Sequence, residues 1–188
     1  MSNVQAELIY DDFWLLDIEV DTLAKLKITE KINEDTGEAV LTPHLAPSNL
    51  KDHHKKTKII IATDGSVVYP QSLYLVSKLR GDGKVKDTNC IAKALLLFTR
   101  FLESTHHEQQ DKNGVLVPPQ YLTYKSLTKY EEEGAPWQFA EFLFTNCRHR
   151  NSQGDEALSL ATAKIYMNSV LAFYKWLQNS GYIKDNCE

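Results

Sequence analysis

Cysteine is scarce and scattered in this chain, and long apolar runs are missing. The three cysteines are far apart and form no Cys-x-x-Cys pair, which predicts neither a disulfide framework nor a structural zinc site. No run of about 18 apolar residues occurs, so we expect no membrane-spanning helix. The first residues also lack the basic and then apolar pattern of a secretory signal. We therefore expect a cytoplasmic protein with reduced thiols, without a metal or any other cofactor.

An excess of positive charge, which phosphate binding requires, is also missing from the chain as a whole, because the formal net charge is −4. The acidity is concentrated at the front. Residues 1–50 hold ten Asp or Glu and three Lys, a net of −7. Residues 51–188 hold eighteen Lys or Arg and fifteen Asp or Glu, a net of +3. This larger part is mildly basic, which permits DNA binding.

What is present is sufficient for a folded core. The 188 residues, 43% of them hydrophobic, suit one compact domain with an appendage. Residues 43–57 are rich in proline and polar side chains, and we place a boundary there. Residues 1–57 then form an N-terminal appendage and linker to which no role is assigned. A segment at 58–84 follows, and 85–188 forms the helical domain.

Turn residues and apolar periodicity predict the elements. Asp64-Gly65 lies between two β-branched runs and predicts a β-hairpin over 58–69, followed by a short helix over 71–80. Further helices are expected at 90–104 (capped by Thr88-Asn89), 124–133, 136–147 and 160–179, with a long polar loop at 105–120. The last helix has the clearest apolar face, which comprises Ala163, Tyr166, Met167, Val170, Phe173, Tyr174 and Leu177.

The order of these pieces resembles the core-binding (SAM-like) domain of tyrosine recombinases of the phage-integrase type. The resemblance rests on a hairpin, a short helix, the helix CIAKALLLFTRFLES, a long loop, a helix with WQFAEFLF and the closing LATAKIYMNSVLAFYKWLQNSGYIKDN. In the closing segment the family pattern is matched by Thr162, Phe173-Tyr174, Trp176, Gly181, Ile183 and Asn186, whereas Cys187 occupies the family's proline position. The resemblance covers about residues 58–188.

The resemblance implies a fold and a function. The fold would be mainly α, a small helical bundle preceded by the β-hairpin and the appendage. The bundle would clamp double-stranded DNA together with a separate catalytic domain, and it would contact other recombinase protomers on the DNA. The site-specific cutting and rejoining that underlie DNA integration would belong to that catalytic domain, which we expect this chain to lack. As an isolated fragment it should be a monomer that is not itself an enzyme.

Nine residues are expected to contact DNA. Lys164, Asn168, Lys175 and Asn179 lie opposite the apolar face of the last helix, where lysines would neutralise phosphates and asparagines would bond phosphates or base edges. The other five are Lys93, Arg100, Arg148, Arg150 and Thr162. A further basic stretch, 51–58, would act as an arm along the DNA.

Other readings of the same residues stay open. A polar stripe on a helix is often only its solvated side. The aromatic faces of the helices also suit a protein–protein interaction module without DNA binding. A self-contained enzyme is disfavoured, because Arg148-His149-Arg150 lacks the family's His-x-x-Arg spacing: the residue three after His149 is Ser152. The paired histidines His53-His54 and His106-His107 are expected to be surface residues, not metal ligands.

Overall fold

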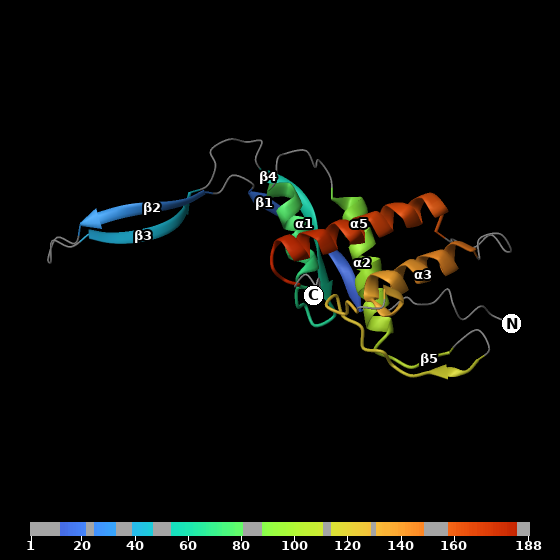
Figure 1. Ribbon diagram of the computed structural model, residues 1–188. Helices are drawn as coiled ribbons and strands as arrows, with labels where there is room; N and C mark the ends of the chain where they lie inside the picture. Colours follow the sequence, from blue (N-terminus) through green and yellow to red (C-terminus); the bar gives the residue numbers. More distant parts are fainter. Residues whose placement is uncertain are drawn as a thin grey trace.

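Antiparallel strand pairs precede a group of helices in the computed structural model (Figure 1). The structure describes residues 12–21, 25–32, 39–46, 54–80, 88–110, 114–128, 131–148 and 158–183. Strand β1 (Phe13–Asp21) pairs with β4 (His54–Ala62). Strand β2 (Lys25–Ile32) pairs with β3 (Ala39–Ala46), and Figure 1 shows this second pair projecting away from the helices.

The helices follow the strands in the chain. Their bounds are α1 (Gln71–Arg80), α2 (Asn89–Ser104), α3 (Ala135–Arg148) and α5 (Leu160–Asn179). A short 3-10 turn, η2 (Glu131–Glu133), leads into α3. Two-residue strands β5 (Gln109–Gln110) and β6 (Leu116–Val117) pair between α2 and η2. None of the described helices is long and apolar enough to cross a membrane.

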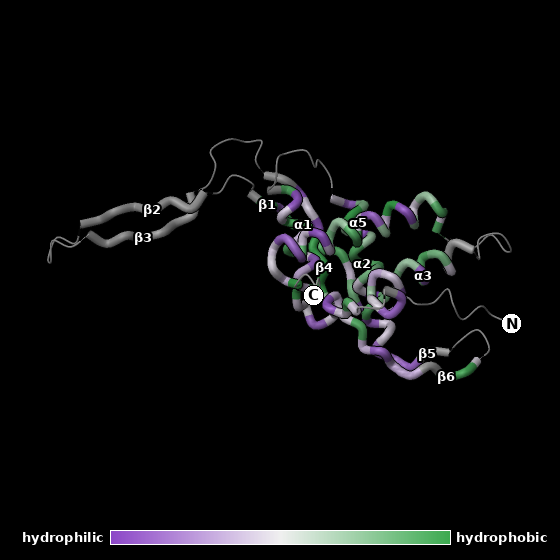
Figure 2. The backbone as a smooth tube through the Cα atoms, viewed as in Figure 1, coloured by the Kyte–Doolittle hydropathy of each residue, from purple (hydrophilic) through white to green (hydrophobic). Residues whose placement is uncertain are grey.

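Aromatic rings from three helices form the centre of the core. Phe98 of α2 lies 5.1 Å from Phe139 of α3 and 6.0 Å from Tyr174 of α5, measured between ring centroids. Phe98, Phe139 and Phe173 are fully buried. Figure 2 shows hydrophobic residues alternating with hydrophilic ones along α2 and α5, as expected for helices with one buried face. Each such ring contributes about 1.5–3 kcal/mol of burial free energy.

The β1–β4 pair is part of this core. Ile60 of β4 is fully buried, and its backbone N–H donates a 2.9 Å hydrogen bond to the Ser72 hydroxyl of α1. Across the pair, Lys58 Nζ lies 2.7 Å from Asp17 Oδ1. Phe13 and Leu15 of β1 pack against the buried residues of the helices. The described part of the chain is therefore an α/β structure, in which β1 completes one side of the helical core.

These strands revise the expectations for the first third of the chain. The boundary expected after residue 57 falls inside β4, and part of the expected linker, His54 to Thr57, belongs to that strand. The partner of β4 is β1, so β1 belongs to the folded unit and not to an appendage beside it.

The hairpin expected over 58–69 is wrong in its second strand. The turn forms, with Gly65 at φ 80° and Ser66 N–H donating to Asp64 Oδ1. Beyond it only a single bridge, Ile61 to Val67, continues the pairing. The reason is that Pro70 and the start of α1 end the extended chain directly afterwards.

The helix prediction is mixed. The helices expected at 71–80, 90–104, 136–147 and 160–179 are confirmed to within one residue at each end. The helix expected over 124–133 is wrong for the described residues of that span. Residues 124–128 form a turn and irregular chain, and Glu131–Glu133 is a 3-10 turn. The expected polar loop contains the small β5–β6 pair.

Candidate nucleic-acid interface

Helix α5 presents one face to the core and the other to solvent. Its buried face includes Val170, Phe173 and Leu177. On the opposite side the four predicted contact residues Lys164, Asn168, Lys175 and Asn179 are all exposed. The expected orientation of the helix is therefore confirmed, and these four side chains, which we call the α5 stripe, are accessible to a ligand.

Local sequence fixes where α5 begins and ends. The Ser159 hydroxyl accepts a 3.1 Å hydrogen bond from the backbone N–H of Thr162, which is a standard N-cap. At the other end Gly181 adopts φ 72°, a conformation that favours glycine, and Tyr182 N–H bonds back to Leu177 O. The stripe thus lies on a helix whose two ends are both capped.

The electrostatics of α5 favour anions. Residues 157–184 contain three lysines and no Asp or Glu, so the Lys164 and Lys175 ammonium groups have no acidic neighbour within their own helix. Small exposed residues, Ala161 and Ala172, lie on the same side. Exposed Ile165 and Leu171 border this face. Its two ammonium groups can still neutralise phosphates.

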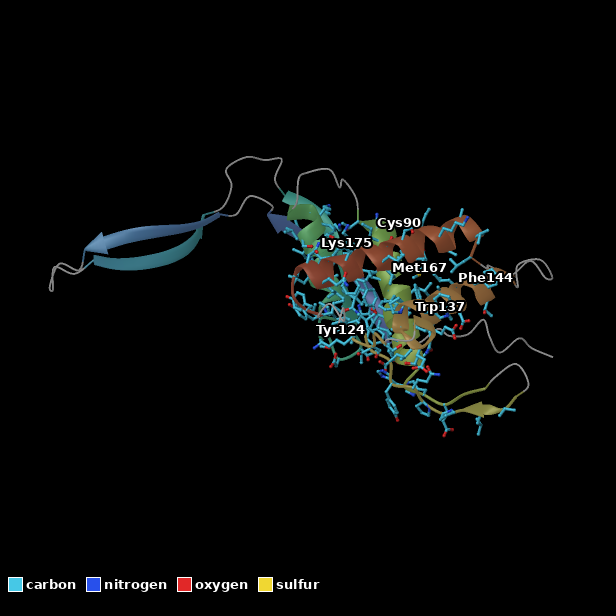
Figure 3. All side chains as sticks on the ribbon, in the orientation of Figure 1. Cys90, Tyr124, Trp137, Phe144, Met167 and Lys175 are labelled. Atoms are coloured by element: carbon cyan, nitrogen blue, oxygen red, sulfur yellow. The ribbon has the colours of Figure 1, made fainter. Side chains whose placement is uncertain are left out.

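Lys93 is the predicted contact residue on α2, the helix that crosses α5. It is exposed, one turn after Cys90. Figure 3 shows Cys90 beside the middle of α5, where Met167 is labelled. The Lys93 ammonium group is therefore accessible to a ligand.

Arg100 is placed differently from the expectation. Its Nη2 atom donates a 2.6 Å hydrogen bond to the backbone carbonyl of Phe13, and the residue is partly buried. The guanidinium holds β1 against α2, so Arg100 is not part of the candidate interface. The Thr162 hydroxyl also has a partner within its own helix end, because it is hydrogen-bonded to the Ser159 hydroxyl at 2.8 Å.

The remaining expected contacts are not brought into the site. Arg148 is the last residue of α3, and its side chain, like all of Arg150, lies outside the described residues. Of the basic stretch 51–58, residues 54–58 form part of β4, and Lys58 is paired with Asp17. This part of the stretch is a strand and not an arm.

An aromatic cluster at the C-terminal end of α5 was missed by the sequence reading. The Trp176 ring stacks on Tyr182 at 5.4 Å, and Tyr182 meets the Tyr69 ring edge-on at 5.7 Å. The two tyrosine hydroxyls are hydrogen-bonded to each other. Tyr69 and Tyr182 are 113 residues apart in the chain, so no local sequence pattern predicts their contact. The only signal was the family-like Trp176 near the helix end.

Among the described residues, a large change of pKa occurs only at two buried phenols. Burial raises the pKa of Tyr74 to about 12 and raises that of Tyr174 further. A phenol that acts as a nucleophile needs the opposite shift. Among the described residues no group of three or more His, Cys, Asp or Glu is arranged to hold a metal ion.

Comparisons with family models, with curated proteins and with solved structures find no match to this chain.

Proposed function

We propose that this chain is a module that binds double-stranded DNA, of the kind found in the core-binding part of site-specific tyrosine recombinases. The observation that carries the proposal is the α5 stripe, in which Lys164 and Lys175 are exposed on one side of a helix without acidic residues. The order of helices α1, α2, α3 and α5 supports the family assignment, as do the residues of the closing segment that match the family pattern.

The spacing of the stripe suits a DNA groove. Lys164 and Lys175 are eleven residues apart, which is about three turns and about 16 Å along the helix axis. Because the opposite face is buried in the core, the helix cannot turn another side outward. The major groove is about 12 Å wide, so two lysines at this separation reach phosphates on its two sides. Asn168 lies between them, where it can reach a base edge or a further phosphate.

In this proposal the chain contributes DNA affinity and target preference to DNA integration or recombination. The strand-breaking chemistry belongs to a catalytic domain of the parent recombinase, whose other protomers would join it on the DNA.

Binding to a fluorescein-labelled 30-base-pair duplex, followed by anisotropy across a salt series, tests the proposal. We expect weak binding whose logarithm falls linearly with the logarithm of salt concentration, because phosphate contacts release counterions. Binding that is independent of salt, or no binding at low salt, would overturn the proposal.

A second function is favoured by a different observation. Trp137 and Phe144 are seven residues apart on α3, and both side chains are exposed (Figure 3). On α5, Ile165 and Leu171 are also exposed. Apolar side chains in this number can serve a protein–protein interaction module. Sedimentation at several salt concentrations separates the two functions, because an apolar association persists in high salt and DNA binding does not.

A further inference from the structure

Four aromatic rings form a continuous series from the core to the surface. Tyr74 of α1 lies 5.4 Å from Trp176 of α5, Trp176 lies 5.4 Å from Tyr182, and Tyr182 lies 5.7 Å from Tyr69. The exposed fraction rises along this series, from 1% at Tyr74 to 54% at Tyr69. Core packing explains the buried end. It does not explain a large ring held half in solvent at the other end.

The hydroxyl contact fixes the outer rings in place. Tyr69 and Tyr182 bond each other through their hydroxyls, and their rings stand at 75°. The hydrogen bond to Tyr182, with burial and the charges of Tyr182 and Tyr124, raises the pKa of Tyr69. Tyr69 is therefore an uncharged phenol at neutral pH, and its ring stands edge-on to that of Tyr182.

Lysines lie over Tyr74, at the buried end of the series, and over Tyr124, which is close enough to Tyr69 to affect its pKa. Lys78 Nζ is 4.9 Å from the centroid of Tyr74, and Lys125 Nζ is 5.7 Å from that of Tyr124. Lys175 precedes Trp176 in the chain and is exposed. Figure 3 shows Lys175 and Tyr124 toward the C-terminal end of α5, with Trp137 on α3 away from them. Aromatic rings and ammonium groups in the same region are the two components of a site that binds single-stranded nucleic acid.

We propose that the exposed Tyr69 ring, supported by Tyr182 and Trp176 behind it, forms a stacking platform for an unpaired base of single-stranded DNA. Lys175 and Lys125 would neutralise the flanking phosphates. This inference deepens the proposed function and rests on it. The α5 stripe binds duplex DNA, and the platform at the end of α5 binds bases that have left the duplex. Bases inside a duplex are already stacked on both faces, so the platform discriminates between paired and unpaired DNA. Stacking on a ring tolerates any base, which predicts little sequence preference at this point.

The test measures binding of a labelled twelve-nucleotide oligothymidylate to the full chain by anisotropy. We expect Tyr69→Ala to weaken this binding by about 5- to 150-fold, the factor that corresponds to ~1–3 kcal/mol per stacked base. Tyr69→Phe keeps the ring and removes its hydroxyl contact with Tyr182, so it should bind more weakly than the parent but more tightly than Tyr69→Ala. Trp137→Ala removes an exposed ring elsewhere and should have no effect. Thermal unfolding of each variant establishes that the fold is intact.

Three outcomes would overturn the platform: unchanged affinity in Tyr69→Ala, an equal loss in Trp137→Ala, or an equal loss in Tyr69→Phe. Duplex binding, measured in parallel, should be unchanged in Tyr69→Ala. If the parent chain fails to bind duplex, the proposed function fails by itself. If the chain binds duplex and the Tyr69→Ala result is negative, only the platform fails.

A fluorescence measurement reports on the platform directly. A background of Trp14→Phe and Trp137→Phe leaves Trp176 as the only indole. Stacking of a base on this cluster should quench its emission on addition of oligothymidylate, and an equal concentration of duplex should quench it less. Equal quenching by both forms would contradict the discrimination between paired and unpaired DNA.

Discussion

The guanidinium of Arg100 in α2 donates a 2.6 Å hydrogen bond to the backbone carbonyl of Phe13 in β1, 87 residues earlier in the chain. This carbonyl belongs to the first residue of a strand whose only strand partner among the described residues is β4. The contact therefore closes one edge of the β1–β4 pair against the helices.

We predict that Arg100 acts on stability and not on DNA binding. Arg100→Met keeps the aliphatic part of the side chain and removes a charged hydrogen bond, so it should lower the free energy of unfolding by about 1.5–3 kcal/mol. Lys93→Met on the exposed side of the same helix should change it by no more than about 0.5 kcal/mol. Urea unfolding measures the free energy of unfolding of both variants. A larger effect of Lys93→Met than of Arg100→Met would contradict this assignment.

A second long-range pair joins β4 to the start of α2. The hydroxyls of Thr57 and Thr88 lie 2.8 Å apart, and both residues are buried. Replacing one of them by Val leaves the other hydroxyl without this partner and should cost about 1–3 kcal/mol. Replacing both removes the two hydroxyls together and should cost much less than the sum. A double-mutant cycle in urea measures the coupling, and strictly additive effects would show that the two hydroxyls do not depend on each other.

Alkaline pH should destabilise the fold through its buried phenols. The pKa of Tyr74 is raised to about 12 by burial, whereas an unfolded tyrosine titrates near about 10. Between these values the folded chain keeps a proton that the unfolded chain releases. The contribution of the protonated phenol to the free energy of unfolding is complete below about pH 10. It is lost as pH rises from about 10 to about 12, at up to ~1.4 kcal/mol per pH unit for each tyrosine.

Tyr74→Phe isolates this effect from the titration of lysines in the same range. The variant should lose less stability than the parent between pH 9 and pH 11, as measured by urea unfolding at each pH. An identical loss in both proteins would mean that the Tyr74 phenol ionises as easily in the folded chain as in the unfolded one.

The helices could be predicted from the sequence because each one buries a face against its neighbours. In α5 the apolar residues recur at helical spacing, and Ser159 and Gly181 mark its two ends. The strand β1 could not be recognised in the same way, because its partner β4 begins 33 residues after it ends. Thr88 was expected to cap α2, yet its hydroxyl makes no cap hydrogen bond and contacts Thr57 instead.

The sequence likewise predicts one part of the candidate site and not the others. Exposure of the α5 stripe follows from helical periodicity alone, and the sequence predicted it. The role of Arg100 depends on where β1 meets α2, which no local pattern encodes. The aromatic platform requires Tyr69 to reach Tyr182 across the fold, so only the tertiary structure reveals it.

The salt dependence of duplex binding in the double variant Lys164→Ala/Lys175→Ala tests the central claim most directly. Each lost phosphate contact should reduce the slope of log affinity against log salt by about 0.9, so the double variant should show a slope smaller by about 1.8. Lys164→Arg/Lys175→Arg keeps both charges and should retain the parent slope. If the alanine variant is folded and keeps the parent slope and affinity, the α5 stripe is only the solvated side of a helix.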